Sequence, residues 1–176
     1  MDLFPLQVGV QVPNAAERVA RHASLWARTR TDDGIMLQVD MRNAFNSIYR
    51  QEMLKEGKSR TPLLYPYAAA RYQSPSVLIG DGFEVNSSQG VQQGDVCGHL
   101  LFSVILHRLL LRLEQLGLSF QHWYLDDGIL CGKIEVVVNA VQLLCSGTSC
   151  RGLGWSSAWT NVWWLGSVLE VSIILG

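Results

Sequence analysis

Tyr124-Leu125-Asp126-Asp127-Gly128 lies between two runs rich in apolar and aromatic residues, 119–125 and 128–131. Asp-Gly between such runs is a strong hairpin signal, so the sequence predicts two antiparallel strands with two acids at their turn. Adjacent carboxylates repel one another, and a divalent cation, which prefers oxygen ligands, offsets that repulsion. An Asp-Asp-Gly turn that merely faces solvent is the commoner case, so the pair alone leaves both interpretations open.

Another acid ends a predicted strand further upstream. Residues 35–40, Ile-Met-Leu-Gln-Val-Asp, form a compact apolar run, which predicts a buried strand with Asp40 at its exit. Phosphoryl transfer by two metals needs carboxylates that hold cations about 3.5–4 Å apart. Neighbouring strands lie about 4.8 Å apart, so Asp40 and the Asp126-Asp127 turn supply that geometry if their strands are adjacent. The sequence alone does not show whether these two strands are neighbours in the sheet.

The rest of the chain predicts an α+β fold. Asn14 and Glu17 have the spacing of a capping box at a helix start, and Pro66 is expected to interrupt a helical or irregular segment. We expect helices at 14–29, 43–55, 97–116 and 135–145, a helical or irregular segment at 62–72, a hairpin at 76–80 and 83–86, and a polar loop at 87–95. Paired strands alternating with helices favour an antiparallel sheet packed against helices.

Composition indicates one globular domain. The chain has 176 residues, of which 48% are hydrophobic and 16% charged, so it can bury a sizeable core and is not disordered. The formal net charge is −1, which neither requires nor excludes a nucleic-acid partner. The four cysteines are scattered, which favours reduced thiols in an intracellular protein, cytoplasmic or nuclear. We expect no signal peptide, because the first residues, 1–5, have no basic region followed by a long apolar run. We expect no transmembrane segment, because charges interrupt the apolar run 100–116.

The C-terminal segment differs from the rest in composition. Residues 136–176 contain only two charged side chains, and four of the six tryptophans lie there. The aromatic run could stack on bases, although core packing or a poorly structured tail is commoner. We therefore expect residues 146–176 to form an atypical Trp-rich tail.

Three sequence motifs, in a fixed order along the chain, carry a family resemblance. Residues 37–46, Leu-Gln-Val-Asp-Met-Arg-Asn-Ala-Phe-Asn, resemble motif A of reverse transcriptases. Residues 87–95, Ser-Ser-Gln-Gly-Val-Gln-Gln-Gly-Asp, followed by Leu-Leu-Phe-Ser at 100–103, resemble motif B, most closely that of non-LTR retrotransposons. Tyr124-Leu125-Asp126-Asp127 resembles motif C. The resemblance covers residues 7–145 and implies part of the right-hand polymerase fold. It implies that 1–32 is a remnant of the fingers or of the finger–palm connection and that 33–145 is the palm, followed by the tail at 146–176.

The resemblance implies a role for each matching residue. Asp40 and Asp126 would be catalytic ligands of two Mg²⁺ ions, with Mn²⁺ as a possible substitute, and the backbone carbonyl of Met41 would assist them. Asp127 would be a catalytic acid in less direct contact with the metals. On the nucleotide side, Phe45 would exclude a ribose 2′-OH and Gln93 and Gly94 would touch the incoming nucleotide, while Tyr124 would pack beneath the primer end. Without the resemblance, periodicity favours core packing for Phe45, and a plain turn leading into a helix is as natural for the loop as a nucleotide contact.

The implied partners are an RNA template, a DNA primer and dNTPs. The chain departs from the family where Val96-Cys97-Gly98-His99 replaces the usual prolines, which predicts a looser turn on the nucleotide side. No lysine follows Lys133, so the lysine that protonates the leaving pyrophosphate has no counterpart. We expect segments of fingers and thumb to be missing, and therefore little or no activity from this chain alone.

Two further functions stay open. A catalytically inert retroelement remnant would at most bind nucleic acid and would lack metal binding that depends on Asp40 and Asp126. An RNA-dependent RNA polymerase would share the palm chemistry, but Phe45 argues against it, because such enzymes need a polar contact to the 2′-OH.

Overall fold

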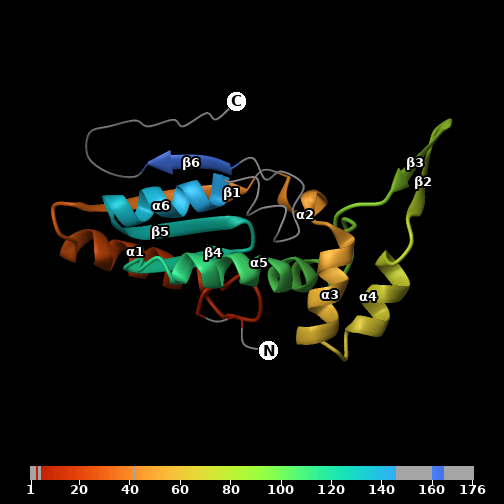
Figure 1. Cartoon of the computed structure of the whole chain (residues 1–176), viewed down its shortest axis with the longest axis horizontal. Helices are drawn as coiled ribbons and strands as arrows, with labels where there is room; N and C mark the ends of the chain where they lie inside the picture. Colours follow the sequence, from red (N-terminus) through yellow and green to blue (C-terminus); the bar gives the residue numbers. More distant parts are fainter. Residues whose placement is uncertain (1–2, 4, 42, 146–159, 165–176) are drawn as a thin grey trace.

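The computed structural model describes residues 3, 5–41, 43–145 and 160–164. Its main sheet has four strands in the order β4-β5-β1-β6, and every neighbouring pair is antiparallel. These strands are β1 (Gly34–Met41), β4 (Phe120–Tyr124), β5 (Asp127–Lys133) and β6 (Thr160–Trp164). The α+β fold with an antiparallel sheet packed against helices, predicted from the sequence, is confirmed (Figure 1).

Helices cover the sheet and extend beyond it. They are α1 (Ala15–Thr29), α2 (Ala44–Ser47), α3 (Arg50–Arg60), α4 (Tyr65–Tyr72), α5 (Gly98–Glu114) and α6 (Ile134–Cys145). The apolar helix α5 contributes a long buried stripe to the core, α6 contacts β5 and β1, and α1 lies against β4. No helix in the described part of the chain has the length and apolar character needed to cross a bilayer.

The core lies where one face of the sheet meets these helices. Leu37 and Val39 of β1 are buried there, with Trp123 of β4 and Leu130 of β5. Because side chains alternate across a strand, Asp40 lies on the opposite face from Leu37 and Val39. The burial of one face therefore fixes the face on which the acid emerges.

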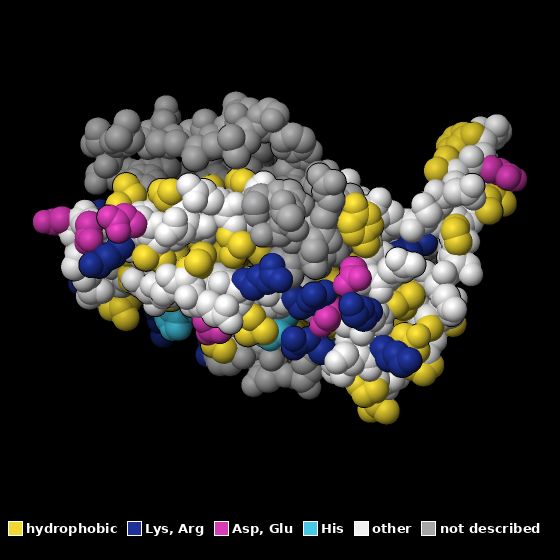
Figure 2. All heavy atoms as spheres, viewed as in Figure 1, with side chains coloured by type: hydrophobic (Ala, Val, Ile, Leu, Met, Phe, Trp, Pro, Cys, Tyr) yellow, Lys and Arg dark blue, Asp and Glu magenta, His cyan; other side chains and the backbone are white. Residues whose placement is uncertain are grey.

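A second, two-stranded sheet stands apart from the main one. It consists of β2 (Ser76–Gly80) and β3 (Phe83–Ser87), the hairpin predicted at this place. In Figure 1 it projects away from the helices, and Figure 2 shows apolar side chains near its tip. Ile79 is 80% exposed and Phe83 61%, so most of its apolar surface faces solvent.

Several local predictions were wrong. Asn14 is the N-cap residue of α1, as predicted, but the capping box is absent: the backbone of Asn14 is left-handed, its side chain makes no capping hydrogen bond, and Glu17 forms an ion pair with Arg21 (3.1 Å). The helix predicted at 43–55 is broken between α2 and α3, where the backbone becomes extended. Pro66 lies in the first turn of α4, where its missing N–H costs nothing, and does not interrupt the helix.

The C-terminal segment contains an unpredicted strand. β6 pairs with β1 over Leu37–Met41 and thereby completes the sheet. Residues 146–159 and 165–176 of this segment lie outside the described residues, so the stacking interpretation and the division into three parts stay predictions.

Candidate functional site

The pairing of β1 with β5 brings the predicted acids together. Asp40 is directly opposite Asp127 in the antiparallel register, so both side chains emerge on the same face of the sheet. The N–H of Met41 donates to the carbonyl of Asp126 (3.2 Å), which ties the end of β1 to the turn. Strands that are remote in sequence therefore place Asp40 beside the Asp126-Asp127 pair.

The hairpin turn differs in detail from the prediction. Tyr124 pairs with Asp127, so the connecting residues are Leu125 and Asp126, and Asp127 already belongs to β5. Leu125 takes the left-handed conformation, with φ at 57°. Gly128 is not a turn residue: a Cβ there would lie 2.7 Å from the ring of Trp123, so glycine is needed because the indole occupies that space.

The three carboxylates interact electrostatically. Burial raises the pKa of the Asp126 carboxyl above its usual value, and the negative charges of Asp127 and Asp40 raise it further. Burial and the charge of Asp40 also raise the pKa of Asp127. The folded chain thus opposes ionisation of these acids, and a bound cation would favour it.

The donor chemistry fits a hard divalent cation. Among the described residues, no three His, Cys, Asp or Glu side chains form a ready-made set of metal ligands. Mg²⁺ does not need one, since it commonly keeps several waters and binds one or two carboxylates together with substrate phosphates. The residues that could hold it are Asp40 and Asp126, with Asp127 at the edge of the site.

Gln7 holds the turn in place, a role that no sequence pattern predicted. Its side chain is fully buried, and its Oε1 accepts the N–H of Leu125 (2.9 Å) and that of Gly9 (2.9 Å). Its Nε2 donates to the carbonyl of Leu125 (3.2 Å). Both backbone groups of the left-handed residue are thus held by one side chain, and Asp126 follows directly.

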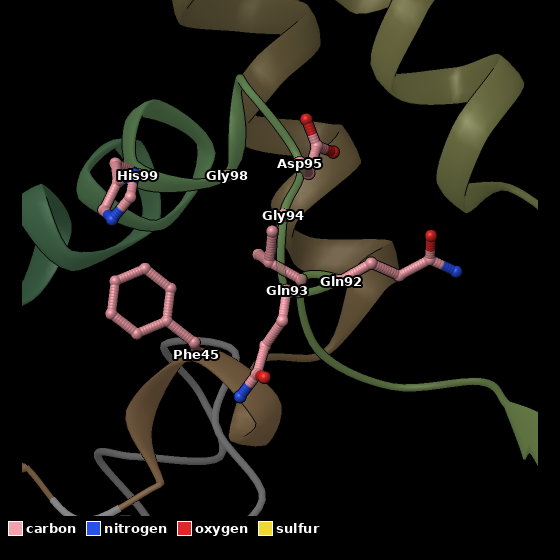
Figure 3. A pocket seen from close by; sticks show the side chains of 8 residues that line it. Phe45, Gln92, Gln93, Gly94, Asp95, Gly98 and His99 are labelled. Carbon is pink, nitrogen blue, oxygen red and sulfur yellow. The ribbon is translucent and has the colours of Figure 1, made fainter.

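A pocket of about 220 Å³ gathers the residues predicted for the nucleotide side. Phe45, Gln93 and Gly94 all line it, together with His99 from the start of α5 (Figure 3). The ring of Phe45 is stacked on Phe102 (centroids 4.2 Å apart), so it is anchored in the core while one side faces the pocket. The volume is below that of a typical small-molecule site, about 300–1,000 Å³, so the pocket would hold only part of a nucleotide.

His99 links the pocket to the acids. Its imidazole meets the ring of Phe45 edge-on, with centroids 5.6 Å apart. It also lowers the pKa of Asp126, opposing the larger effects of burial and of the neighbouring acids. The pocket and the carboxylates therefore belong to one site. His99 occupies one of the places where the family usually has proline, so the motif comparison did not mark it.

The loop before α5 is docked on the backbone of α2. The N–H of Gly90 donates to the carbonyl of Ile48 (2.9 Å), and the N–H of Val91 donates to that of Phe45 (2.9 Å). A Cβ on Gly90 would lie 2.5 Å from the Cα of Asn46, so close backbone approach is required there. It is not required at Gly94, where a Cβ would meet nothing, and glycine serves the positive φ of 84° instead.

Side-chain hydrogen bonds hold the turn that lacks the family's prolines. The Asp95 carboxylate accepts the N–H of Cys97 (2.8 Å), the hydroxyl of Tyr67 (2.8 Å) and the hydroxyl of Tyr72. Burial opposes ionisation of Asp95, but these three hydrogen bonds outweigh it and keep its pKa below the usual value. A loose turn was predicted here, and the structure instead contains a carboxylate with three donors.

Tyr124 is half exposed at the end of β4, with 47% of its surface accessible. It lies next to the turn, so it is free to meet a ligand placed at the acids. Its primer-side role stays a prediction.

Solved telomerase structures resemble this fold. Telomerase from Candida albicans, in complex with a TWJ fragment of telomeric RNA, matches with a TM-score of 0.66 and 11% identity over 95% of this chain and 33% of that one. Apo telomerase from Candida tropicalis, truncated from its C-terminal domain, matches with a TM-score of 0.64 and 11% identity over 97% of this chain and 36% of that one. No protein-family model and no curated protein matches the sequence.

These matches show the fold. The chain therefore shares a fold with part of these telomerases. It spans about a third of the length of the telomerases that it matches. At 11% identity these matches concern the fold alone, and the chemistry and partners of this chain depend on its own site residues.

Proposed function

We propose that this chain is the palm of an RNA-directed DNA polymerase from a retroelement, of the non-LTR type to which its motif B is most similar. The reaction would be transfer of a deoxynucleotide to a DNA primer on an RNA template. The observation that carries the proposal is the register of β1 and β5, which sets Asp40 opposite Asp127 and beside Asp126. The neighbouring pocket, with Phe45 and Gln93, supports it.

The residues of the chain would act by positioning. Asp40 and Asp126, with the carbonyl of Met41, would hold two Mg²⁺ or Mn²⁺ ions, and Asp127 would add negative charge at the site. Bound metals of this kind lower the pKa of an attacking hydroxyl and stabilise charge on the leaving oxygens. Gln7 would keep Asp126 in place by fixing the turn.

Phe45 would select the sugar. Its ring is held against Phe102 and cannot retreat, so a ribose 2′-OH placed above it would lose space and a hydrogen-bond partner. This favours deoxynucleotides and disfavours an RNA-dependent RNA polymerase. Gln93 and Gly94 would contact the nucleotide from the other side, and Tyr124 the primer end.

Primer extension tests the proposal. The chain, extended to include fingers and thumb segments, is incubated with an RNA template, a DNA primer, dNTPs and Mg²⁺; product should form, and Asp126→Asn should abolish it. Asp81→Asn, which alters an exposed acid at the tip of the β2–β3 hairpin, is the matched control and should leave the product unchanged. Product that survives Asp126→Asn would overturn the metal-ligand assignment.

Calorimetry separates a working site from an inert remnant when turnover is too slow to detect. Mg²⁺ or Mn²⁺ titrated in the presence of dNTP should bind the native chain and should fail to bind Asp40→Asn and Asp126→Asn. Absence of such binding in the native chain would favour a remnant that at most binds nucleic acid.

A further inference from the structure

Arg50 is a buried cation whose hydrogen bonds, within the described part of the chain, go to carbonyl and hydroxyl oxygens and not to an acid. It is 6% exposed, and its Nε donates to the carbonyl of Gly90 (2.9 Å). Its Nη1 donates to the carbonyl of Ser87 (2.6 Å) and its Nη2 to the hydroxyl of the same residue (2.8 Å). Because the guanidinium is a rigid fork, three such bonds fix where β3 ends and the following loop begins. Burying a charge is costly, so this placement needs a reason beyond packing.

Tyr72 continues the arrangement to the far end of the loop. Its ring lies under the Arg50 guanidinium (5.1 Å to the centroid), and its side chain is 1% exposed. Its hydroxyl accepts the N–H of Gln92 (3.2 Å) and donates to Asp95. Burial and the bond to Asp95 raise the pKa of this phenol, so it remains a protonated donor. One stacked pair thus contacts the loop at Ser87, Gly90, Gln92 and Asp95.

The residues between these anchors are those that face the pocket. Gln93 and Gly94 are exposed, and Gly94 has a positive φ with open space around it. Glycine in such a place can adopt many conformations, so the anchors on either side must restrict it. Neither Arg50 nor Tyr72 lines the pocket itself.

We propose that Arg50 and Tyr72 are positioning residues, which set Gln93 and Gly94 against Phe45 and thereby determine how tightly the site binds a nucleoside triphosphate. The identity of the ligand rests on the proposed function, whereas the positioning of the loop does not. A purely structural role would stabilise the whole chain. A positioning role acts on the loop and on ligand affinity, while the main sheet stays unchanged.

Tyr72→Phe is the main test, because it removes the hydroxyl and keeps the ring under Arg50. Tyr67→Phe is the matched control: Tyr67 also donates to Asp95, but it is 41% exposed, and the N–H of Gln92 donates to Tyr72 and not to Tyr67. Arg50→Lys keeps the charge and loses the fork, and serves as the second variant. All three are made in the full chain.

Amide hydrogen exchange measures the loop directly. We expect exchange at Gln92 to be about tenfold faster or more in Tyr72→Phe, as befits the loss of one buried hydrogen bond. In Arg50→Lys the same increase should occur at Gly90 and Val91. Tyr67→Phe should leave all three amides unchanged, and exchange at Leu37 and Leu130 in the main sheet should be constant throughout. Unchanged loop exchange in both Tyr72→Phe and Arg50→Lys, or equal acceleration in the sheet, overturns the positioning role.

Titration with a fluorescent dATP analogue and Mg²⁺ measures the consequence. The Kd should rise about tenfold in Tyr72→Phe and Arg50→Lys and clearly less in Tyr67→Phe, which leaves Asp95 two donors and the loop its contacts at Gly90 and Gln92. A loosened loop with unchanged Kd overturns the link to affinity. A native chain that binds no dATP analogue overturns the proposed function, and the exchange data then still decide whether Arg50 and Tyr72 position the loop.

Discussion

Replacing Gln7 by methionine should destabilise the chain by about 3 kcal/mol. Methionine has nearly the same length but offers no amide, so the N–H groups of Leu125 and Gly9 and the carbonyl of Leu125 lose their partner. A buried polar group left without a partner costs about 1–3 kcal/mol, and we take the lower value for each of the three because the turn lies near solvent. Leu125 has a left-handed backbone, which such bonds normally stabilise, so its strain adds to the effect.

Urea unfolding, followed by the fluorescence of tryptophan, measures this change. The midpoint should fall while the slope stays constant, since the surface exposed on unfolding hardly changes. Gln142→Met, the same chemical change at an exposed position on α6, should stay within about 0.5 kcal/mol of the native chain. A loss below about 1 kcal/mol in Gln7→Met would show that Gln7 does not hold the turn, because even one unpartnered group should cost that much.

Three other changes test separate features. Gly128→Ala should cost about 1–3 kcal/mol in chemical unfolding, because its Cβ enters the space of the Trp123 ring, while Gly132→Ala in the same strand, where a Cβ makes ordinary contacts, should cost less. Since burial and neighbouring charges raise the pKa of Asp126 and Asp127, their contribution to stability is complete below the unfolded pKa of about 3.9 and is lost as pH rises through the folded values. The Tm of metal-free Asp126→Asn should therefore exceed that of the native chain at pH 7 and approach it at pH 4, and a higher native Tm at pH 7 would contradict this. Burial lowers the pKa of His122, which is hydrogen-bonded to His22 (2.9 Å), so its contribution is complete above about 6.5 and is lost as pH falls. The Trp26 indole packs edge-on against Phe120, whose ring contacts that of His122. The NMR signal of this indole should therefore shift below about pH 6.5 in the native chain and stay constant in His122→Gln.

Local patterns predicted the elements on which the site is built. The apolar run that ends in Asp40, the two runs around Asp126-Asp127 and the periodic helix before residue 116 all carry short-range signals, and each became the expected element. Their order along the chain, through the resemblance, also led to Phe45, Gln93 and Gly94, which the structure brings to one pocket.

Contacts between distant side chains and backbone could not be predicted in this way. Gln7 meets the turn at Leu125, and Arg50 meets Gly90, through hydrogen bonds that depend on how separate elements pack. A single glutamine or arginine in a sequence has no pattern that reveals such a partner. The helical spacing of apolar residues likewise continues across the break at Ile48, because this residue is buried although its backbone is extended.

The register of β1 and β5 has a consequence for folding. The β4–β5 hairpin is local and can form early, but Asp40 reaches it only through contact between strands far apart in the chain, which forms slowly. A slip of one residue would turn Asp40 to the opposite face of the sheet. A partly folded chain, even one with most of its helices and its hairpin, therefore has no assembled acid site, and the appearance of metal binding would report the long-range pairing of β1 with β5.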